Sequence, residues 1–161
     1  MIKVIAEIGI NHNGCLKTAK RLIDVAYVAG CNYVKFQKRE PDLCVPEAQK
    51  NKLRDTPWGQ MKYIDYKHKI EFGKGEFDEL FSYAEQKGIG CFASVWDEPS
   101  VEFMAQYTDI TKVPSALITN ALLCNRAREK NETLIISTGM STEQEIQQSI
   151  PELMGSAKLP T

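Results

Sequence analysis

Short apolar runs alternate with longer segments of helical spacing along most of the chain. Five apolar runs are predicted to be strands, at residues 3–8, 33–37, 89–94, 110–113 and 133–137. Predicted helices cover residues 16–29, 76–87, a short stretch after Pro99, and 121–130. A last helix is expected after Ser141, which forms a capping box with Gln144, and Pro151 should break or kink this helix near its end.

Five strands, each followed by a helix, are typical of an α/β protein with a parallel sheet and right-handed crossovers. Such a sheet is either open and doubly wound or part of a barrel. No GxGxxG or GxxxxGK[ST] motif follows a predicted strand, which disfavours the commonest nucleotide-binding open sheets. A complete barrel needs about 250 residues for its eight β/α units, whereas this chain has 161. The order of elements alone leaves both architectures open.

A long polar stretch, residues 39–75, separates the second predicted strand from the next clear helix. It contains three prolines and the aromatic residues Trp58, Tyr63 and Tyr66. A connection of this length inside a compact domain is usually either functional or disordered. We expect one of these two outcomes for this stretch.

The composition is that of an ordinary soluble globular protein. Hydrophobic residues make up 43% and charged residues 25% of the chain, whose length is enough for one domain with a real core. The net charge of −1 provides no field that attracts nucleic acid or an anionic membrane surface. No apolar run approaches the roughly 18 residues that span a bilayer, and the N-terminus lacks a signal-peptide pattern. We therefore expect a cytoplasmic protein.

The cysteines are odd in number and scattered along the chain, at Cys15, Cys31, Cys44, Cys91 and Cys124. No pair has CxxC spacing, so neither a disulfide framework nor a thiolate zinc site is expected, and a reducing cytosol fits this pattern. We interpret most of these residues as small buried apolar side chains.

Polar side chains end or follow every predicted strand. They are Glu7, Lys35, Gln37, Ser94, Lys112, Ser115 and Ser137. In parallel α/β proteins, ligands bind at the carboxyl edge of the sheet. Lys35 and Gln37 are two residues apart and so share one face of their strand. Two lysines with serine hydroxyls form a chemically sensible cradle for a phosphate and a carboxylate; the alternative is that the lysines extend to solvent and the serines cap helices.

The loop that follows the first strand is rich in polar residues and glycine. An ionised carboxylate is seldom buried without a partner, so Glu7 is expected to point into a polar cavity at the end of its strand. The alternative is a simple turn, residues 9–14, with a histidine that faces solvent.

Several separate motifs resemble, in order and spacing, those of the sialic acid synthase (N-acetylneuraminate synthase) family. They are residues 6–14 (AEIGINHNG), 34–38 (VKFQK), 56–59 (TPWG), 67–72 (KHKIEF), 112–116 (KVPSA) and 136–141 (ISTGMS). The resemblance implies an α/β fold with parallel (β/α) units of a TIM barrel, truncated to about five of eight strands. It places the N-terminal portion of the synthase barrel at residues 1–154 and a tail at the truncation point at residues 155–161, and the C-terminal antifreeze-like domain is absent.

The resemblance also implies a transferase activity in carbohydrate biosynthesis. The family condenses phosphoenolpyruvate with an N-acetylmannosamine-type sugar and releases phosphate. It uses a divalent metal, manganese or magnesium, to polarise the sugar aldehyde. By motif, Glu7 is the catalytic residue that holds the sugar hydroxyls or aldehyde, and Gln37 lines the sugar side. Phosphoenolpyruvate would be held by Lys35, Lys112, Ser115 and Ser137, while Asn11 and His12 receive no role.

Two positions depart from the family pattern. Val95 stands where much of the family has a threonine, and residues 114–117 read Pro-Ser-Ala-Leu where many members read Gly-Ser-Gly-Glu. A phosphate-contacting hydroxyl and a candidate acid/base carboxylate are therefore missing. Either the chain belongs to a subfamily that acts on a related nonulosonate precursor, or its catalysis is eroded.

The metal-binding half of the family's barrel has no counterpart here. Its histidine ligands lie on later strands, and His12 and His68 are the only histidines in this chain. His68 stands in a run of lysines and is interpreted as solvated, so we expect no metal ligands in this chain. Whether the chain alone is an enzyme stays open.

Two hypotheses follow for the function. The first is a nonulosonate synthase fragment that binds phosphoenolpyruvate and an amino sugar. The alternative is a non-catalytic sugar- or phosphate-binding remnant, or one half of a split enzyme that needs a second chain. Open sheet edges favour self-association, so the expected protein partner is a second copy or a complementing C-terminal chain, with no nucleic acid and no membrane. A nuclease-like role for residues 11–13 finds no supporting ligand cluster or basic patch.

Overall fold

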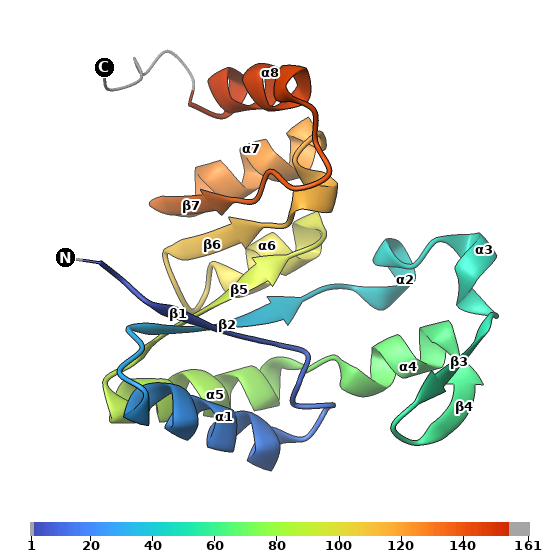
Figure 1. The fold of residues 1–161 in the computed structure, drawn as a ribbon, viewed down its shortest axis with the longest axis vertical. Helices are drawn as coiled ribbons and strands as arrows, with labels where there is room; N and C mark the ends of the chain where they lie inside the picture. The colour runs from blue at the N-terminus through green and yellow to red at the C-terminus, as the bar shows by residue number, and fades with distance from the viewer. Residues whose placement is uncertain (1, 155–161) are drawn as a thin grey trace.

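The computed structural model describes residues 2–154, with side chains through residue 149; the predicted tail, residues 155–161, lies outside this range. Its main sheet contains five parallel strands, β1 (Ile5–Gly9), β2 (Tyr33–Lys38), β5 (Gly90–Val95), β6 (Ile110–Val113) and β7 (Thr133–Ile136). They lie side by side in chain order (Figure 1). A doubly wound sheet reverses its direction of growth at a switch point, whereas a barrel adds every strand on the same side. The strand order is therefore that of a barrel with five consecutive β/α units, and not that of a doubly wound sheet.

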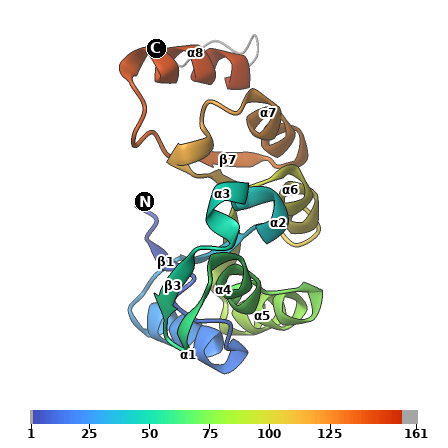
Figure 2. The ribbon, with the colours of Figure 1, turned by 90° about the vertical axis from the view of Figure 1, so that its right-hand side faces the viewer.

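Helices follow the strands and form a layer outside the sheet. They are α1 (Leu16–Val28), α5 (Lys74–Lys87), α6 (Glu98–Met104), α7 (Ala121–Lys130) and α8 (Glu143–Met154). Figures 1 and 2 show them in a row, from α1 and α5 at one end to α8 at the other. Within residues 2–154, none of the helices combines the length and the apolar character that crossing a membrane requires.

One face of the sheet packs against these helices and forms the core. Val34, Phe36, Ala93 and Val95 are almost completely buried there, together with Phe77 of α5. Side chains alternate along a strand, so the residues between them point to the opposite, inner face. That inner face carries the polar side chains at the carboxyl ends of the strands.

The long connection after β2 is ordered and projects beyond the carboxyl end of that strand (Figure 1). We call residues 41–70 the arm; it contains α2 (Pro41–Cys44), α3 (Glu47–Lys50), the antiparallel hairpin β3 (Leu53–Thr56) and β4 (Gly59–Lys62), and α4 (Tyr63–Ile70). The buried Lys67 ammonium lies 5.0 Å from the ring centroid of Tyr63 and 5.3 Å from that of Tyr66. Disorder, one of the two outcomes expected for this stretch, is therefore wrong.

The boundaries of the main elements differ from the predicted ones by a few residues, and α8 also differs in its capping residues and in its course past Pro151. Thr142 and Glu145 cap this helix, because Thr142 N donates to Glu145 Oε2 at 2.6 Å and Glu145 N donates to Thr142 Oγ1 at 3.3 Å. The predicted pair, Ser141 and Gln144, is wrong by one residue. The helix also continues past Pro151 rather than breaking there.

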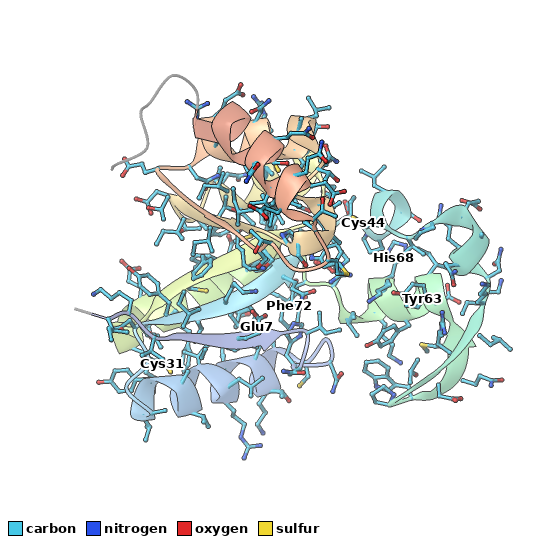
Figure 3. All side chains as sticks on the ribbon, turned by 45° about the horizontal axis from the view of Figure 1, so that its top comes forward. Glu7, Cys31, Cys44, Tyr63, His68 and Phe72 are labelled. Atoms are coloured by element: carbon cyan, nitrogen blue, oxygen red, sulfur yellow. The ribbon has the colours of Figure 1, made fainter. Side chains whose placement is uncertain are left out.

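The prediction that most cysteines are buried is wrong. Cys91 and Cys124 are buried, Cys31 and Cys44 are partly buried, and Cys15 is exposed. All five are free thiols, and Figure 3 shows Cys31 and Cys44 far apart in the molecule. Small size alone does not place a cysteine in the core, because its position on the element decides which face it occupies.

Candidate active site

An open depression of about 310 Å³ lies at the carboxyl edge of β1, β2, β5 and β6. It brings together five of the seven residues proposed from the sequence, namely Glu7, Lys35, Gln37, Ser94 and Lys112. The strand register explains the grouping, because Glu7 pairs with Lys35, Gln37 with Ser94, and Ser94 with Lys112. Parallel strands in this register place the side chains in neighbouring positions on the inner face.

Lys35 lies at the centre of these polar contacts. Its ammonium is 2.5 Å from Glu7 Oε2 and donates to Ser94 Oγ at 2.7 Å. The Lys35 side chain is 6% exposed, whereas that of Glu7 is 55% exposed. Glu7 therefore lies at the open side of the depression rather than deep within a cavity. A buried ammonium needs such partners, because leaving it unpaired in the interior is very costly.

Lys112 adds a second ammonium to the depression. It is partly buried, and this burial lowers the pKa of Lys112; the nearby charge of Lys35 lowers it further, while Glu7 partly offsets both effects. Because Glu7 balances the charge of Lys35, the charge of Lys112 remains as a local excess. The depression therefore favours an anionic ligand group near Lys112.

Gly9 allows the β1 loop to pass close to the polar side chains. A bulge interrupts the β1–β2 register between Glu7 and Gly9, where the backbone has φ +57°. A Cβ at Gly9 would lie 3.1 Å from Glu7 Oε1 and 3.4 Å from Gln37 Nε2. Any larger residue would therefore need a strained backbone and would crowd the two side chains at this corner.

His12 holds the same loop from within the protein rather than facing solvent. Its ring is 3% exposed and stacks on Phe72 with 4.1 Å between centroids. Its Nδ1 accepts the Gly14 N–H at 3.1 Å. Burial lowers the pKa of His12 to about 4, so the ring is neutral near pH 7. His12 therefore supports the loop, and the solvent-facing histidine of the simple-turn alternative is wrong.

Ser115 and Ser137 do not line the depression. Ser115 begins a short 3₁₀ helix, η1 (Ser115–Leu117), and its Oγ would lie 3.6 Å from a Cβ added at Gly139. The Ser137 N–H donates to Val113 O at 3.2 Å and so extends the β6–β7 pairing. Ser115 therefore follows the carboxyl end of β6, and Ser137 follows the carboxyl end of β7.

The lining also contains residues that the sequence interpretation did not assign to the site, namely Gly9, Ile10, Asn11, Trp96 and Pro114. Trp96 follows β5, and the Arg39 guanidinium lies 4.5 Å from its ring centroid. Its position directly after a strand end was the available signal, but an aromatic residue there does not by itself distinguish a lining residue from a core residue.

The described residues do not fit a complete metal site. Between residues 2 and 154, no group of three or more His, Cys, Asp and Glu side chains is arranged to hold an ion. Glu7 pairs with Lys35, and the buried His12 uses Nδ1 to accept a backbone N–H. His68 lies on the arm, where its Nε2 is 3.3 Å from Asp42 Oδ2 (Figure 3). No chemical step through a metal is therefore assigned to this chain.

Comparison with known proteins decides the family. A model described as "NeuB family" matches residues 22–159. The chain is also 36% identical, over 160 residues, to the N-acetylneuraminate-9-phosphate synthase of Drosophila melanogaster, a match that covers 98% of the chain and 43% of the fly protein. The chain belongs to the NeuB family. The resemblance that the sequence motifs indicated is thus confirmed.

A bacterial relative of this NeuB-family chain is the N,N'-diacetyllegionaminic acid synthase of Campylobacter jejuni, 31% identical over 151 residues. That match covers 91% of the chain and 45% of the relative. The chain therefore spans less than half the length of these relatives.

Solved structures agree with this assignment. The N-acetylneuraminic acid synthetase of Leptospira borgpetersenii, determined in complex with citrate, matches with a TM-score of 0.83 at 29% identity, over 94% of this chain and 50% of that one. A truncated 3-deoxy-D-arabino-heptulosonate 7-phosphate synthase from Thermotoga maritima matches with a TM-score of 0.65 at 14% identity, over 94% of this NeuB-family chain and 46% of that one. The second match concerns the fold alone.

Val95 is one of the two positions at which this family member departs from the family pattern. Val95 is completely buried in the core on the helix side of the sheet, and it does not line the depression. The hydroxyl at this edge of β5 comes instead from Ser94, which is also buried and bonds to Lys35.

Proposed function

We propose that this chain forms the phosphoenolpyruvate-binding and sugar-hydroxyl-binding part of a nonulosonate synthase. Such an enzyme condenses phosphoenolpyruvate with an N-acetylmannosamine-type sugar and releases phosphate. The observation that carries the proposal is the grouping of Lys35, Lys112, Ser94 and Glu7 in one depression at the carboxyl edge of a barrel-type sheet. Relatives named as synthases of N-acetylneuraminate-9-phosphate and N,N'-diacetyllegionaminic acid support the reaction class.

The proposed chemistry divides the depression between an anion and a sugar. Lys112 and Lys35 bind the carboxylate and phosphate of phosphoenolpyruvate through charged hydrogen bonds. Glu7, open to solvent beside Lys35, accepts hydrogen bonds from the sugar. The enol carbon then forms a bond to the aldehyde carbon, whose oxygen takes up a proton. Water adds to the resulting cationic carbon and loses a proton, and the bond between this carbon and the phosphate oxygen breaks to release inorganic phosphate. The contribution of these side chains is binding, orientation and charge balance.

A second candidate is a domain that binds both ligands without joining them. The observation that favours it is the lack, within residues 2–154, of a side-chain group that fits a metal ion. Carbonyl activation by manganese or magnesium, which the family resemblance implies, is not assigned to any residue here.

Substitution of Lys35 tests the proposed phosphoenolpyruvate site. We expect Lys35→Met to weaken phosphoenolpyruvate binding by about 1.5–3 kcal/mol, the range for a charged hydrogen bond, which is about 10- to 150-fold in Kd. Isothermal titration calorimetry measures the effect. The matched control is Lys20→Met, because Lys20 pairs with Glu79 on the surface of α1 and α5. Unchanged affinity in Lys35→Met would contradict the assignment.

Phosphate release separates the two candidates. The assay combines the protein, phosphoenolpyruvate and N-acetylmannosamine, with and without manganese, and with and without the C-terminal half of a related synthase. Release by the protein alone supports a complete catalyst. Release only with the added half supports a divided enzyme, and binding without release in every mixture supports the second candidate.

A further inference from the structure

Arg39 holds the side chain of Gln37 from outside the depression. Arg39 follows the last residue of β2 and is 6% exposed. Its Nη2 donates to Gln37 Oε1, and its guanidinium lies 4.5 Å from the ring centroid of Trp96. Gln37 and Trp96 both line the depression, whereas Arg39 does not. Arg39 therefore contacts two lining residues from behind.

Glu71 fixes Arg39 in this position. The Arg39 backbone N–H donates to Glu71 Oε1 at 3.0 Å, and Arg39 Nε lies 3.6 Å from Glu71 Oε2. The Glu71 side chain is 9% exposed, so water screens this pair little. Lys38 lies 3.7 Å from the same carboxylate and donates to Phe72 O at 3.2 Å. The end of β2 is thereby tied to the segment that follows the arm.

The bond from Arg39 decides which end of the Gln37 amide faces Glu7. A primary amide has one acceptor oxygen and one NH₂ donor group, and the two point in different directions. Arg39 donates to the amide oxygen of Gln37. The amide nitrogen, Nε2, lies 3.4 Å from the position that a Cβ at Gly9 would take, and Glu7 Oε1 lies 3.1 Å from the same position. The depression thus has an amide donor beside a carboxylate acceptor.

We propose that Arg39 is a positioning residue that keeps the Gln37 NH₂ group directed toward Glu7, so that this pair binds a hydroxyl group of the ligand. A hydroxyl donates to the Glu7 carboxylate and accepts from the Gln37 amide, whereas an anionic group at the same place is repelled by Glu7. The identity of the ligand, a hydroxyl-bearing sugar, rests on the proposed function. The pair therefore directs the sugar to the Glu7 end and leaves the anion for Lys112 and Lys35.

The orientation of the amide is measurable without any ligand. Because Gln37 Nε2 lies next to Gly9, we expect nuclear Overhauser contacts between the Gln37 amide protons and the Gly9 α-protons in the wild-type protein, with the resonances assigned through Gln37→Ala. These contacts should disappear in Arg39→Met, which keeps a similar side-chain length without the guanidinium. Their absence in the wild type, or their persistence in Arg39→Met, would overturn the proposal.

Ligand affinity provides a second, independent readout. We expect Arg39→Met to weaken N-acetylmannosamine binding about five- to tenfold, the effect of one hydrogen bond, and to leave the Kd for phosphoenolpyruvate unchanged. In a Gln37→Ala background the same substitution should have no further effect on the sugar, because Arg39 acts through Gln37. Arg39→Lys, which retains a donor, should restore part of the affinity, and Arg54→Met on the arm is the matched control.

The outcomes separate the positioning role from the proposed function. Additive losses from Gln37→Ala and Arg39→Met would show a general structural effect and overturn the positioning role. Equal losses for the sugar and for phosphoenolpyruvate would do the same. Failure of the wild-type protein to bind phosphoenolpyruvate would overturn the proposed function instead, and the Overhauser contacts between Gln37 and Gly9 would still decide the orientation.

Discussion

The ammonium of Lys35 links three neighbouring strands through two short contacts. It joins Glu7 on β1 to Ser94 on β5 from its own position on β2. Loss of Glu7 would leave the buried Lys35 charge uncompensated, which is far more destabilising than the net value of the pair. The same residue is therefore important for both the local fold and the proposed anion site, and its substitution needs a binding readout as well as a folding readout.

His12 makes the stability of the protein depend on pH in a defined window. Its pKa is about 4 in the folded protein and about 6.5 when unfolded. Between these values the unfolded chain binds more protons, so stability rises with pH and is lost as pH falls from 6.5 toward 4. We expect the free energy of unfolding at pH 4.5 to be lower than at pH 7 by about 2 kcal/mol from this residue alone.

Urea unfolding at the two pH values measures this contribution. His12→Phe keeps an aromatic ring against Phe72 but cannot be protonated, so its pH dependence should be smaller than that of the wild type. The control is His68→Gln, which removes the other histidine of the chain, about half exposed on the arm; the loss of pH dependence should be larger in His12→Phe than in this variant. An identical pH dependence in His12→Phe and the wild type would contradict the prediction.

For individual residues, the sequence predicted well which polar side chains belong to the site, but it predicted their exact neighbours less well. Alternation on β2 and the apolar neighbours of Lys35 correctly implied that it needs a partner. The sequence could not place Ser115 and Ser137, because the loops after β6 and β7 decide where those hydroxyls lie. The sequence did not predict the role of Arg39 for a similar reason, because its contacts to Gln37 and Glu71 depend on the path of the chain after β2.

The loop after β1 and the end of α4 are in direct contact at Gly14. Gly14 has φ +66°, and a Cβ at this position would lie 2.3 Å from the carbonyl oxygen of Lys69. Gly30, after α1, has φ +77°, and a Cβ added there would have no neighbouring atom within 4 Å. Both glycines have a positive φ, which favours glycine, but only at Gly14 would a side chain also overlap a neighbouring segment.

Paired alanine substitutions separate these two requirements. We expect Gly30→Ala to destabilise the protein by about 1–2 kcal/mol, the value for a left-handed residue with a Cβ. Gly14→Ala should exceed this loss by about 1–3 kcal/mol, because the backbone must move to relieve the overlap. Thermal or urea unfolding measures both variants. Equal losses would show that the contact between Gly14 and Lys69 is relieved easily.

The type and order of the main elements were predictable, whereas the arm was not. The strands have apolar residues that face the helices, and Gly88, with φ +72°, ends α5 directly after the predicted helix of residues 76–87. The hairpin, residues 53–62, is largely exposed and has no alternating apolar pattern. Its neighbours are held by contacts such as those of Lys67 with Tyr63 and Tyr66, which depend on tertiary structure.

The whole sheet has β1 at one edge, where apolar side chains are exposed. Ile2 is 88%, Val4 50% and Ile5 41% exposed, and β1 pairs only with β2 among the strands of residues 2–154. Exposed apolar edge strands favour pairing with another chain. We expect the protein to self-associate as its concentration rises, measured by sedimentation velocity.

Charge substitution at the edge tests this expectation. Ile2→Lys with Val4→Lys should shift the protein toward the monomer. The control pair, Val25→Lys with Val28→Lys, adds the same charge on α1, where the two valines are 66% and 83% exposed. A wild-type protein that stays monomeric at all concentrations, or equal effects of the two pairs, would contradict a role for the β1 edge.

The chain-order arrangement of the strands has a consequence for how free energy is distributed over the molecule. Each β/α unit contacts mainly the units immediately before and after it, so the fold resembles a linear array with nearest-neighbour coupling. Among the strands of residues 2–154, β5 is held on both sides, by β2 and β6, whereas β1 and β7 are each held on one side. Local opening therefore requires least free energy at the two ends, and amide exchange should slow progressively toward β5.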